Sequence, residues 1–360
     1  MRAKRWCACF VLIVVSFAII LMMLAYIIDP LNLYSWNEIR FVNSGVYFNP
    51  GIIRNYDADY YVIGSSMIQN TDMDQVRAAG YNRPVKLEKG GMTVNEELMI
   101  LCLIASCGQN TPILLNIDLS TLVQADSIQP SSNVFNEELY STTNLDDWRY
   151  LLGYETWWRY IPLTVAMELL GLIGDLPSMF DFVLDIDQIG RWWDSYRNSF
   201  GRETIIEQFI AGKGGTSALP YSVTRQEVFS KIDDFVEQLS LYTGNLESVT
   251  IGFPPYSALY WYTQKMNGDI DLLLDAKCYL QEKLLELDNV WIVDMQDHPS
   301  ITDLDYYKDQ THYDLILQHD YTDAFLSEGG NVHNVEEIED KRCQLEELIV
   351  TFESENSSWL

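Results

Sequence analysis

The sequence predicts an α/β protein in which a five-stranded parallel sheet lies between two layers of helices, behind an N-terminal membrane helix. Two observations support this prediction. Five short apolar runs have no polar face, which is typical of buried parallel strands. The intervals between them contain helical patterns, and an alternation of strand and helix produces a doubly wound layer with right-handed crossovers. At 360 residues, of which 48 % are hydrophobic, the chain can bury a core of this size.

Residues 1–29 predict a short cytoplasmic stub and a membrane anchor. Arg2, Lys4 and Arg5 precede the unbroken apolar run CACFVLIVVSFAIILMMLAYII. A run of roughly 20 such residues crosses a bilayer, and basic residues before a first span stay in the cytoplasm, so the chain after Asp29 is expected outside. A cleaved signal peptide is the alternative. Its apolar core is usually only about 7–15 residues long, and this run ends without a clear small-x-small cleavage site.

The predicted strands follow a linker over residues 30–56 and occupy residues 58–63, 84–87, 112–117, 248–253 and 290–293. Between the second and third strands, TVNEELMILCLIASCG predicts a helix with Thr93 as its N-cap and Gly108 as its stop. The interval before the fourth strand is too long for one crossover helix, so about 121–246 is expected to be a helical insertion. One domain over 57–330 and an amphipathic C-terminal helix over 331–360 complete the chain.

The insertion is rich in Trp and Tyr, most clearly in RWWDSYRNSF. Aromatic side chains beside an apolar helix can seat a segment on the outer surface of a membrane or line a substrate groove. A helical cap that buries its own aromatic residues fits the same pattern. The sequence leaves these three interpretations open.

The composition excludes one class of partner. Asp and Glu outnumber Lys and Arg by 52 to 23, which gives a formal net charge of -29. Such a field repels phosphate backbones, so no nucleic acid is expected as a partner. The cysteines show no paired metal-ligand spacing, and neither a metal nor a cofactor is expected.

The first predicted strand ends abruptly in YYVIGSS. In parallel α/β sheets, ligands and catalytic groups lie at the carboxyl ends of strands, so a serine here is well placed. Gly and Ser are also ordinary turn residues, and the turn alone does not identify a nucleophile. A serine nucleophile needs a base, and the base needs a partner that fixes its tautomer.

His312 is the candidate base among the four histidines. It lies past the fifth strand in YYKDQTHYD, where the chain returns to the same edge of the sheet, and Asp309 precedes it by three residues. In a helical turn this spacing places the carboxylate beside the imidazole. There it can accept the Nδ1 proton and leave Nε2 facing a serine.

These stretches resemble the SGNH/GDSL hydrolase superfamily. IGSS after the first strand, KGGMT after the second and KDQTHYD after the last are similar to its first, second and fifth blocks. The chain is most similar to the membrane-anchored, extracytoplasmic bacterial branch, which includes DltD-like proteins and the acyltransferase or esterase-like proteins of surface-polysaccharide systems. GFPPYSALYW after the fourth strand also fits that branch. The resemblance covers most of residues 57–326 and implies a flavodoxin-like sheet.

The resemblance also implies roles for single residues. The family's Gly-Asp-Ser corresponds to GSS, which makes Ser66 the nucleophile and puts Ser65 in the place of the usual Asp. His312 becomes the general base and Asp309 its orienting partner. The oxyanion hole would use the backbone N–H groups of Ser66 and Gly91, directed at charge that arises only in the tetrahedral intermediate.

One block departs from the family. Its Gly-x-Asn-Asp after the third strand is replaced by LLNIDLS, so the Asn side-chain donor of the oxyanion hole is not evident. Asn116 is a candidate stand-in, but a residue in a buried strand can point away from the site, and Asp118 and Ser120 are as near. The departure is compatible with a transferase, with a differently built oxyanion site or with a degenerate enzyme.

The stretch GFPPYSALYW is expected at the mouth of the site, where aromatic side chains suit sugar faces as well as apolar chains. A turn fixed by proline and leading into a packed helix explains the same residues. The residues expected to contact substrate are Ser65, Thr93, Asp118, Tyr256, Ser257 and Trp261.

The predicted function is extracytoplasmic, serine-dependent acyl-ester chemistry, either hydrolysis or O-acyl transfer, on a cell-envelope or exported glycan. The predicted partners are the glycan or acyl-ester substrate, the membrane through the N-terminal helix and, by resemblance, a membrane-bound O-acyltransferase. The alternative from another class is a catalytically degenerate SGNH scaffold that acts as a binding or assembly partner of a membrane acyl-export system. A peptidase with the same triad is a third interpretation.

Overall fold

The computed structural model describes residues 2–35, 45–123, 137–143, 146–173, 191–193, 199–212 and 223–360. The chain divides into two compact units. One consists of Met1–Asp57 and Phe135–Ile186, and the other consists of Ala58–Val134 and Asp187–Leu360. The segment expected to form one insertion, about 121–246, is therefore shared between the two units, whereas the sheet belongs to the second unit alone.

The second unit contains a five-stranded parallel sheet with the strand order β2-β1-β3-β4-β5. The strands are β1 (Tyr60–Gly64), β2 (Pro84–Glu88), β3 (Ile113–Asn116), β4 (Val249–Phe253) and β5 (Val290–Asp294). All five lie where the apolar runs predict them, with ends shifted by at most two residues. Strands β1 to β4 are buried along their whole length, and β2 buries Lys86 and Glu88 beside its apolar residues.

The direction of the strand order changes at β1. From β1 the chain passes to β2 on one side and then returns to β3 on the other, so β1 and β3 flank a topological switch point. In open parallel sheets, ligands bind outside the carboxyl ends of the strands at such a point. Ser66 follows β1 and Asp118 follows β3, and both residues therefore lie at the edge where a site is expected.

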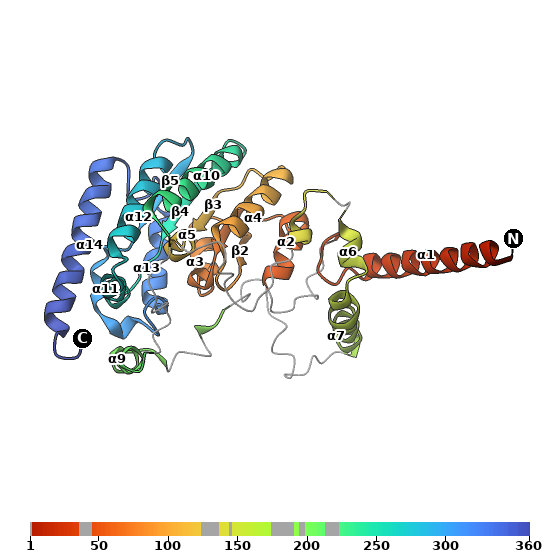
Figure 1. Cartoon of the computed structure of the whole chain (residues 1–360), viewed down its shortest axis with the longest axis horizontal. Helices are drawn as coiled ribbons and strands as arrows, with labels where there is room; N and C mark the ends of the chain where they lie inside the picture. The colour runs from red at the N-terminus through yellow and green to blue at the C-terminus, as the bar shows by residue number, and fades with distance from the viewer. Residues whose placement is uncertain are drawn as a thin grey trace. The chain divides into compact units, whose positions relative to one another are not determined.

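The second unit also contains helices that pack against one another and against the sheet. Those described are α3 (Met73–Ala78), α4 (Val94–Ser106), α5 (Leu119–Val123), α9 (Arg202–Ile210), α10 (Arg225–Thr243), α11 (Ala258–Asn267), α12 (Ile270–Leu284), α13 (Leu315–Leu326) and α14 (Val335–Asn356), with 3₁₀ turns at Ser66–Ile68, Pro299–Thr302 and Leu304–Tyr306. α3 packs against β2 and α13, and α12 packs against β5. α10 packs against α4 and α12, and α14 packs against α11 and α12. Figure 1 shows α14, in blue, alongside α11 and α12.

Local sequence fixes the ends of these helices. Thr93 caps α4 as predicted: its Oγ1 accepts a hydrogen bond from the N–H of Glu96 at 3.4 Å, and the Glu96 carboxylate accepts one from the N–H of Thr93 at 2.8 Å. The same capping box, formed by Thr224 and Glu227, begins α10. Just after α4, Gly108 has a φ of 71°, a left-handed conformation that glycine adopts at little cost.

The first unit contains the apolar N-terminal helix that the sequence predicts. Ala3–Ile28 within α1 is long and apolar enough to cross a membrane, and no other helix among the described residues is. Phe10, Leu12 and Phe17 on this helix are each more than half exposed. The described elements of this unit are α1 (Arg2–Ile28), α2 (Gly45–Asn55), α6 (Asp147–Leu151) and α7 (Ile161–Ile173), with a 3₁₀ turn at Glu137–Tyr140 and a π-helical turn at Thr156–Tyr160.

The chain leaves α1 through a turn that is held by hydrogen bonds. The Asp29 carboxylate accepts from the N–H groups of Leu33 at 2.7 Å and Tyr34 at 2.9 Å. Helix α2 then lies within the segment that was expected to be a linker, and its Phe48 and Ile52 are buried. This segment therefore has apolar packing of its own.

Candidate active site

The chain turns sharply after β1 and presents Ser66. A Cβ atom at Gly64 would lie 2.8 Å from the Cβ atom of Asn116, so the close approach of β1 and β3 requires glycine there. Ser65 is buried and caps the 3₁₀ turn, with its Oγ accepting from the N–H of Met67 at 3.4 Å. Ser66 begins the turn and is partly exposed. The glycine and the first serine thus have structural roles, and the second serine has its hydroxyl available for chemistry.

Ser66 and His312 are in hydrogen-bond contact across 246 positions of the chain. Ser66 Oγ lies 2.8 Å from His312 Nε2, and Nδ1 lies 2.8 Å and 3.0 Å from the two carboxylate oxygens of Asp309. Because an ionised carboxylate only accepts hydrogen bonds, we assign the proton to Nδ1, which leaves Nε2 to accept the Ser66 proton. The structure therefore brings together the three residues that the sequence selects.

The structure corrects the local geometry around the base. The sequence predicts that Asp309 and His312 lie in a helical turn. They lie instead in a loop closed by an isolated β-bridge between Tyr307 and Tyr313. Asp309 Oδ1 accepts from the N–H groups of Thr311 and His312, both at 2.9 Å. Asp side chains commonly stabilise turns in this way. One carboxylate thus builds the loop and orients the imidazole that the loop carries.

The surroundings of Asp309 stabilise its ionised form. Burial alone would raise the pKa of the carboxyl, but the charge and hydrogen bonds of His312, with the N–H group of Thr311, outweigh burial and hold the pKa well below its usual range. Asp309 is therefore ionised at neutral pH, as an orienting carboxylate has to be.

Two backbone N–H groups are available for an oxyanion at this edge of the sheet. Within the described part of the chain, neither Ser66 N–H nor Gly91 N–H donates to a protein acceptor. Gly91 lies in a turn closed by the N–H of Met92 and the carbonyl of Lys89 at 3.0 Å, and its φ of 66° favours glycine. Ser66 follows β1 and Gly91 follows β2, and these strands are parallel neighbours.

Asn116, the predicted third oxyanion residue, lies at the end of β3 and is fully buried. Its Oδ1 accepts a hydrogen bond from the Tyr321 hydroxyl at 2.9 Å. Tyr321 occupies the space that Gly252 leaves on β4, where a Cβ atom would overlap the hydroxyl. The oxygen of Asn116 is therefore engaged in packing β3 against α13.

Asp118 joins two other predicted site residues. Its carboxyl accepts hydrogen bonds from the Tyr256 hydroxyl, at 2.8 Å, and from Ser65. Burial raises the pKa of the Asp118 carboxyl, although these hydrogen bonds and the charge of His312 act in the opposite direction. Ser65 and Tyr256 are 1 % and 2 % exposed, whereas Asp118 is partly exposed. Of the three, Asp118 is the one with surface for a substrate.

Three of the predicted substrate residues serve the fold instead. Thr93 caps α4 through its hydroxyl. Ser257 caps α11, accepting from the N–H of Tyr260 at 3.2 Å, and donates to the carbonyl of Gln310 at 2.7 Å. Ser257 and Trp261 have no accessible surface, so neither can contact a substrate in this conformation. GFPPYSALYW is thus mainly a turn that leads into a packed helix, as its alternative interpretation states.

Trp192 lies at the site, although the sequence does not single it out. Its ring and that of His312 are nearly perpendicular, at 86°, with centroids 5.5 Å apart. Its Nε1 donates to the carbonyl of Ser66 at 3.3 Å. The aromatic character of RWWDSYRNSF was the available signal, but no local pattern indicates which of its rings meets the imidazole.

A buried carboxyl on α4 makes stability depend on pH. Glu97 is 1 % exposed, and within the described structure its Oε2 has no hydrogen-bond partner. Burial, with the charges of Asp118 and Glu96, raises the pKa of Glu97 well above its ordinary value of 4.5. A raised carboxyl pKa stabilises the fold below the unfolded value, and this contribution is lost as the pH rises through the folded pKa.

Replacing Glu97 by Gln, which has the shape of the protonated acid, is therefore expected to stabilise the protein at pH 7. The free energy of unfolding should increase by about 1.4 kcal/mol for each unit by which the pKa of Glu97 is raised, up to the limit at which this pKa equals the pH of the measurement. Denaturant unfolding of both proteins at pH 4 and pH 7 measures the effect, which should be confined to pH 7. An equal effect at the two pH values would show that Glu97 does not titrate as described.

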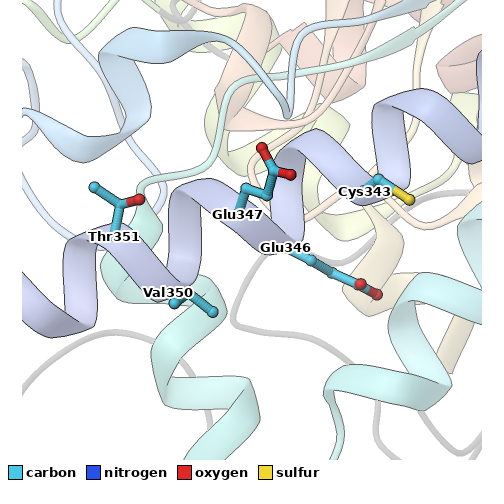
Figure 2. Close-up of a pocket in the computed structure, with 5 residues that line it drawn as sticks. All are labelled: Cys343, Glu346, Glu347, Val350 and Thr351. Carbon is cyan, nitrogen blue, oxygen red and sulfur yellow. The ribbon is translucent and has the colours of Figure 1, made fainter.

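A separate hollow lies on the surface of α14. Figure 2 shows the residues that line it: Cys343, Glu346, Glu347, Val350 and Thr351. All five come from one helix, and none of them belongs to the Ser66, His312 and Asp309 constellation. This hollow is therefore separate from the candidate active site at the edge of the sheet.

No protein-family model matches the chain, and no curated protein shows significant similarity to it. Among the described residues, no group of three or more His, Cys, Asp or Glu side chains is placed to hold a metal ion. The chemistry that the site can perform is thus argued from its own geometry.

Proposed function

We propose that the protein is a serine esterase or O-acyltransferase that acts on acyl esters of a cell-envelope or exported glycan. The observation that supports this function most directly is the continuous relay from Ser66 through His312 to Asp309, with contacts of 2.8 Å on both ring nitrogens. A hydroxyl, an imidazole and a carboxylate in this order activate serine for attack on an acyl carbon.

The relay supports a two-step acyl transfer. Ser66 Oγ attacks the ester carbonyl while its proton passes to His312 Nε2, and the Ser66 and Gly91 N–H groups would stabilise the resulting oxyanion. Collapse of this intermediate expels the alcohol, which takes the proton from Nε2 and leaves an acyl-serine. Water or a sugar hydroxyl then attacks the acyl-serine and gives its proton to Nε2. The second collapse releases the acyl product and returns the proton to Ser66.

The proposal includes membership of the SGNH/GDSL superfamily, in its membrane-anchored bacterial branch, with a three-layer, flavodoxin-like domain. The strand order and the positions of Ser66 after β1 and of His312 after β5 support this assignment. The basic residues before the apolar helix support a cytoplasmic N-terminus and an extracytoplasmic site. Because acyl groups used outside the cell must first cross the membrane, the partner that we propose is a membrane-bound O-acyltransferase.

One observation favours a second candidate function. Asn116, whose Nδ2 would supply the third oxyanion donor, has no accessible surface, so its amide cannot reach a substrate oxygen in this conformation. A weakened oxyanion site is compatible with a degenerate scaffold that binds a component of a membrane acyl-export system. Loss of one such donor typically costs about 10²–10³ in kcat. A loss of this size slows an enzyme without abolishing its activity, so catalysis remains the preferred function.

Labelling with a fluorophosphonate probe separates the two functions. We expect the full chain, purified in detergent, to form a covalent adduct at Ser66 that mass spectrometry can locate. Ser66→Ala should abolish the adduct because it removes Oγ. Ser240→Ala, which removes an exposed hydroxyl on α10, is the matched control and should be labelled like the wild type.

The opposite result would favour the scaffold. A wild-type chain that shows a folded circular dichroism spectrum, but neither reacts with the probe nor hydrolyses p-nitrophenyl acetate, lacks an activated serine. The small acyl group of this ester makes exclusion by a narrow pocket a poor explanation for such a result.

A further inference from the structure

Trp192 is bonded at two points to the short segment that carries Ser66. Its indole Nε1 donates to the Ser66 carbonyl at 3.3 Å. The backbone N–H groups of Trp192 and Trp193 both donate to Oδ1 of Asn70, at 3.2 Å and 3.1 Å. Asn70 is 4 % exposed and lies two residues after the 3₁₀ turn that Ser66 begins. Both ends of the segment 66–70 are thus hydrogen-bonded to Trp192, which comes from a distant part of the chain.

The same indole contacts the base. The Trp192 and His312 rings are nearly perpendicular with their centroids 5.5 Å apart, while Asp309 bonds the Nδ1 edge of the imidazole. Proton transfer requires Oγ and Nε2 to be about 2.6–3.2 Å apart. A second contact on the imidazole restricts the ring rotations that would break this approach.

Other side chains already occupy the indole surface. The Lys308 ammonium lies 4.9 Å from the ring centroid, and Phe200 stacks on the ring at 6.1 Å with an angle of 9° between the planes. A tryptophan that serves as a platform for a sugar needs an open face. Lys308 also precedes Asp309 directly, so this contact holds the loop of the base. The contacts favour a positioning role over substrate binding.

We propose that Trp192 is a positioning residue that joins the turn of Ser66 to the loop of His312 and keeps Oγ and Nε2 within proton-transfer distance. This inference rests on the proposed function and deepens it, because it assigns a role at the site to a residue from the aromatic segment. None of the three interpretations of RWWDSYRNSF includes this role, in which an aromatic residue supports the site without contacting the substrate.

A matched series of variants tests the inference through the second-order rate constant for labelling by the fluorophosphonate. Trp192→Phe keeps an aromatic ring but loses the Nε1 donor, and we expect labelling to slow about fivefold. Trp192→Leu loses both contacts, and we expect a loss of about a hundredfold. Trp193→Phe, the neighbouring control, should react like the wild type, and thermal melts verify that each variant is folded. A folded Trp192→Leu that reacts within about twofold of the wild type would overturn the inference.

Tryptophan fluorescence supplies a readout that needs no activity. An imidazole in contact with an indole alters the emission of the indole, so His312→Gln should change the emission spectrum relative to the wild type. The same replacement should leave the emission of Trp192→Phe unchanged and should change that of Trp193→Phe. An emission change on His312→Gln in a chain that the probe cannot label would support the contact and overturn the proposed function. Normal labelling of Trp192→Leu, with no emission change on His312→Gln, would overturn the inference alone.

Discussion

Replacing Asp309 by Asn is expected to slow acylation of Ser66 by about 10⁴-fold while leaving the fold intact. The Asn amide donates to Nδ1, which moves the imidazole proton to Nε2, where it blocks acceptance of the Ser66 proton. Asn keeps an oxygen for the N–H groups of Thr311 and His312, so the loop should keep its shape. The rate constant for fluorophosphonate labelling measures the effect.

Asp303→Asn is the matched control for this substitution. Asp303 lies in the same stretch of chain, is exposed and caps the 3₁₀ turn Leu304–Tyr306. Asn is as good a cap as Asp, so the control should label at the wild-type rate. Labelling of Asp309→Asn within about tenfold of the wild type would show that His312 acts without Asp309, and the triad would have to be abandoned.

The second large effect is expected on stability, from Lys277→Met. Lys277 on α12 and Asp294 at the end of β5 are both fully buried, with Nζ 2.8 Å from Oδ2. Removing one partner of a buried ion pair leaves the other charge uncompensated and costs about 3–5 kcal/mol. We expect the free energy of unfolding at pH 7 to decrease by this amount, as measured by denaturant titration.

This ion pair also makes the stability of the protein depend on pH. Burial would raise the pKa of Asp294, but the charges of Lys277 and Lys341 outweigh burial and hold the pKa below its ordinary value of 3.8. A depressed carboxyl pKa contributes stability above the unfolded value, and this contribution is lost as the pH falls through the folded pKa. In Lys277→Met, the loss of stability on acidification should therefore be smaller.

The double variant Lys277→Met/Asp294→Asn serves as the control. It removes both charges and keeps a side-chain oxygen for Gln281, which donates to Asp294 at 2.8 Å. Replacing a whole buried pair is often nearly neutral, so the double variant should recover most of the lost stability. Equal destabilisation of the single and double variants would contradict an electrostatic origin.

The sequence predicts those features that depend on local pattern. Buried strands are mostly apolar, and all five runs become strands, although β2 also buries Lys86 and Glu88 and β5 is exposed at Trp291. The spacing of Asp309 and His312 brings carboxylate and imidazole together in a loop as well as it would in a helix, because the side chain of Asp309 forms the turn itself. The prediction that Asp309 pairs with His312 is therefore correct, although the predicted helical turn is wrong.

The remaining features depend on how deeply each side chain is buried and on contacts between segments that are distant in the sequence. An aromatic side chain suits a site and a core equally well, so the sequence does not reveal that Trp261 is fully buried. The hydrogen bond from Trp192 to the Ser66 carbonyl joins residues 126 positions apart, and no periodicity encodes it. The hydrogen bond from Tyr256 to Asp118 joins residues 138 positions apart, so no local pattern in the sequence predicts it either.

The distance of 246 positions between Ser66 and His312 also has a consequence during synthesis. At about 5–20 residues per second, the base is made about 10–50 s after the serine. Throughout this interval the growing chain already has its apolar N-terminal helix, but its hydroxyl has no imidazole to accept the proton. On the proposed function, we expect a chain that stops anywhere before His312 to be inert, with reactivity appearing only when the last part of the sheet unit has been translated and has folded.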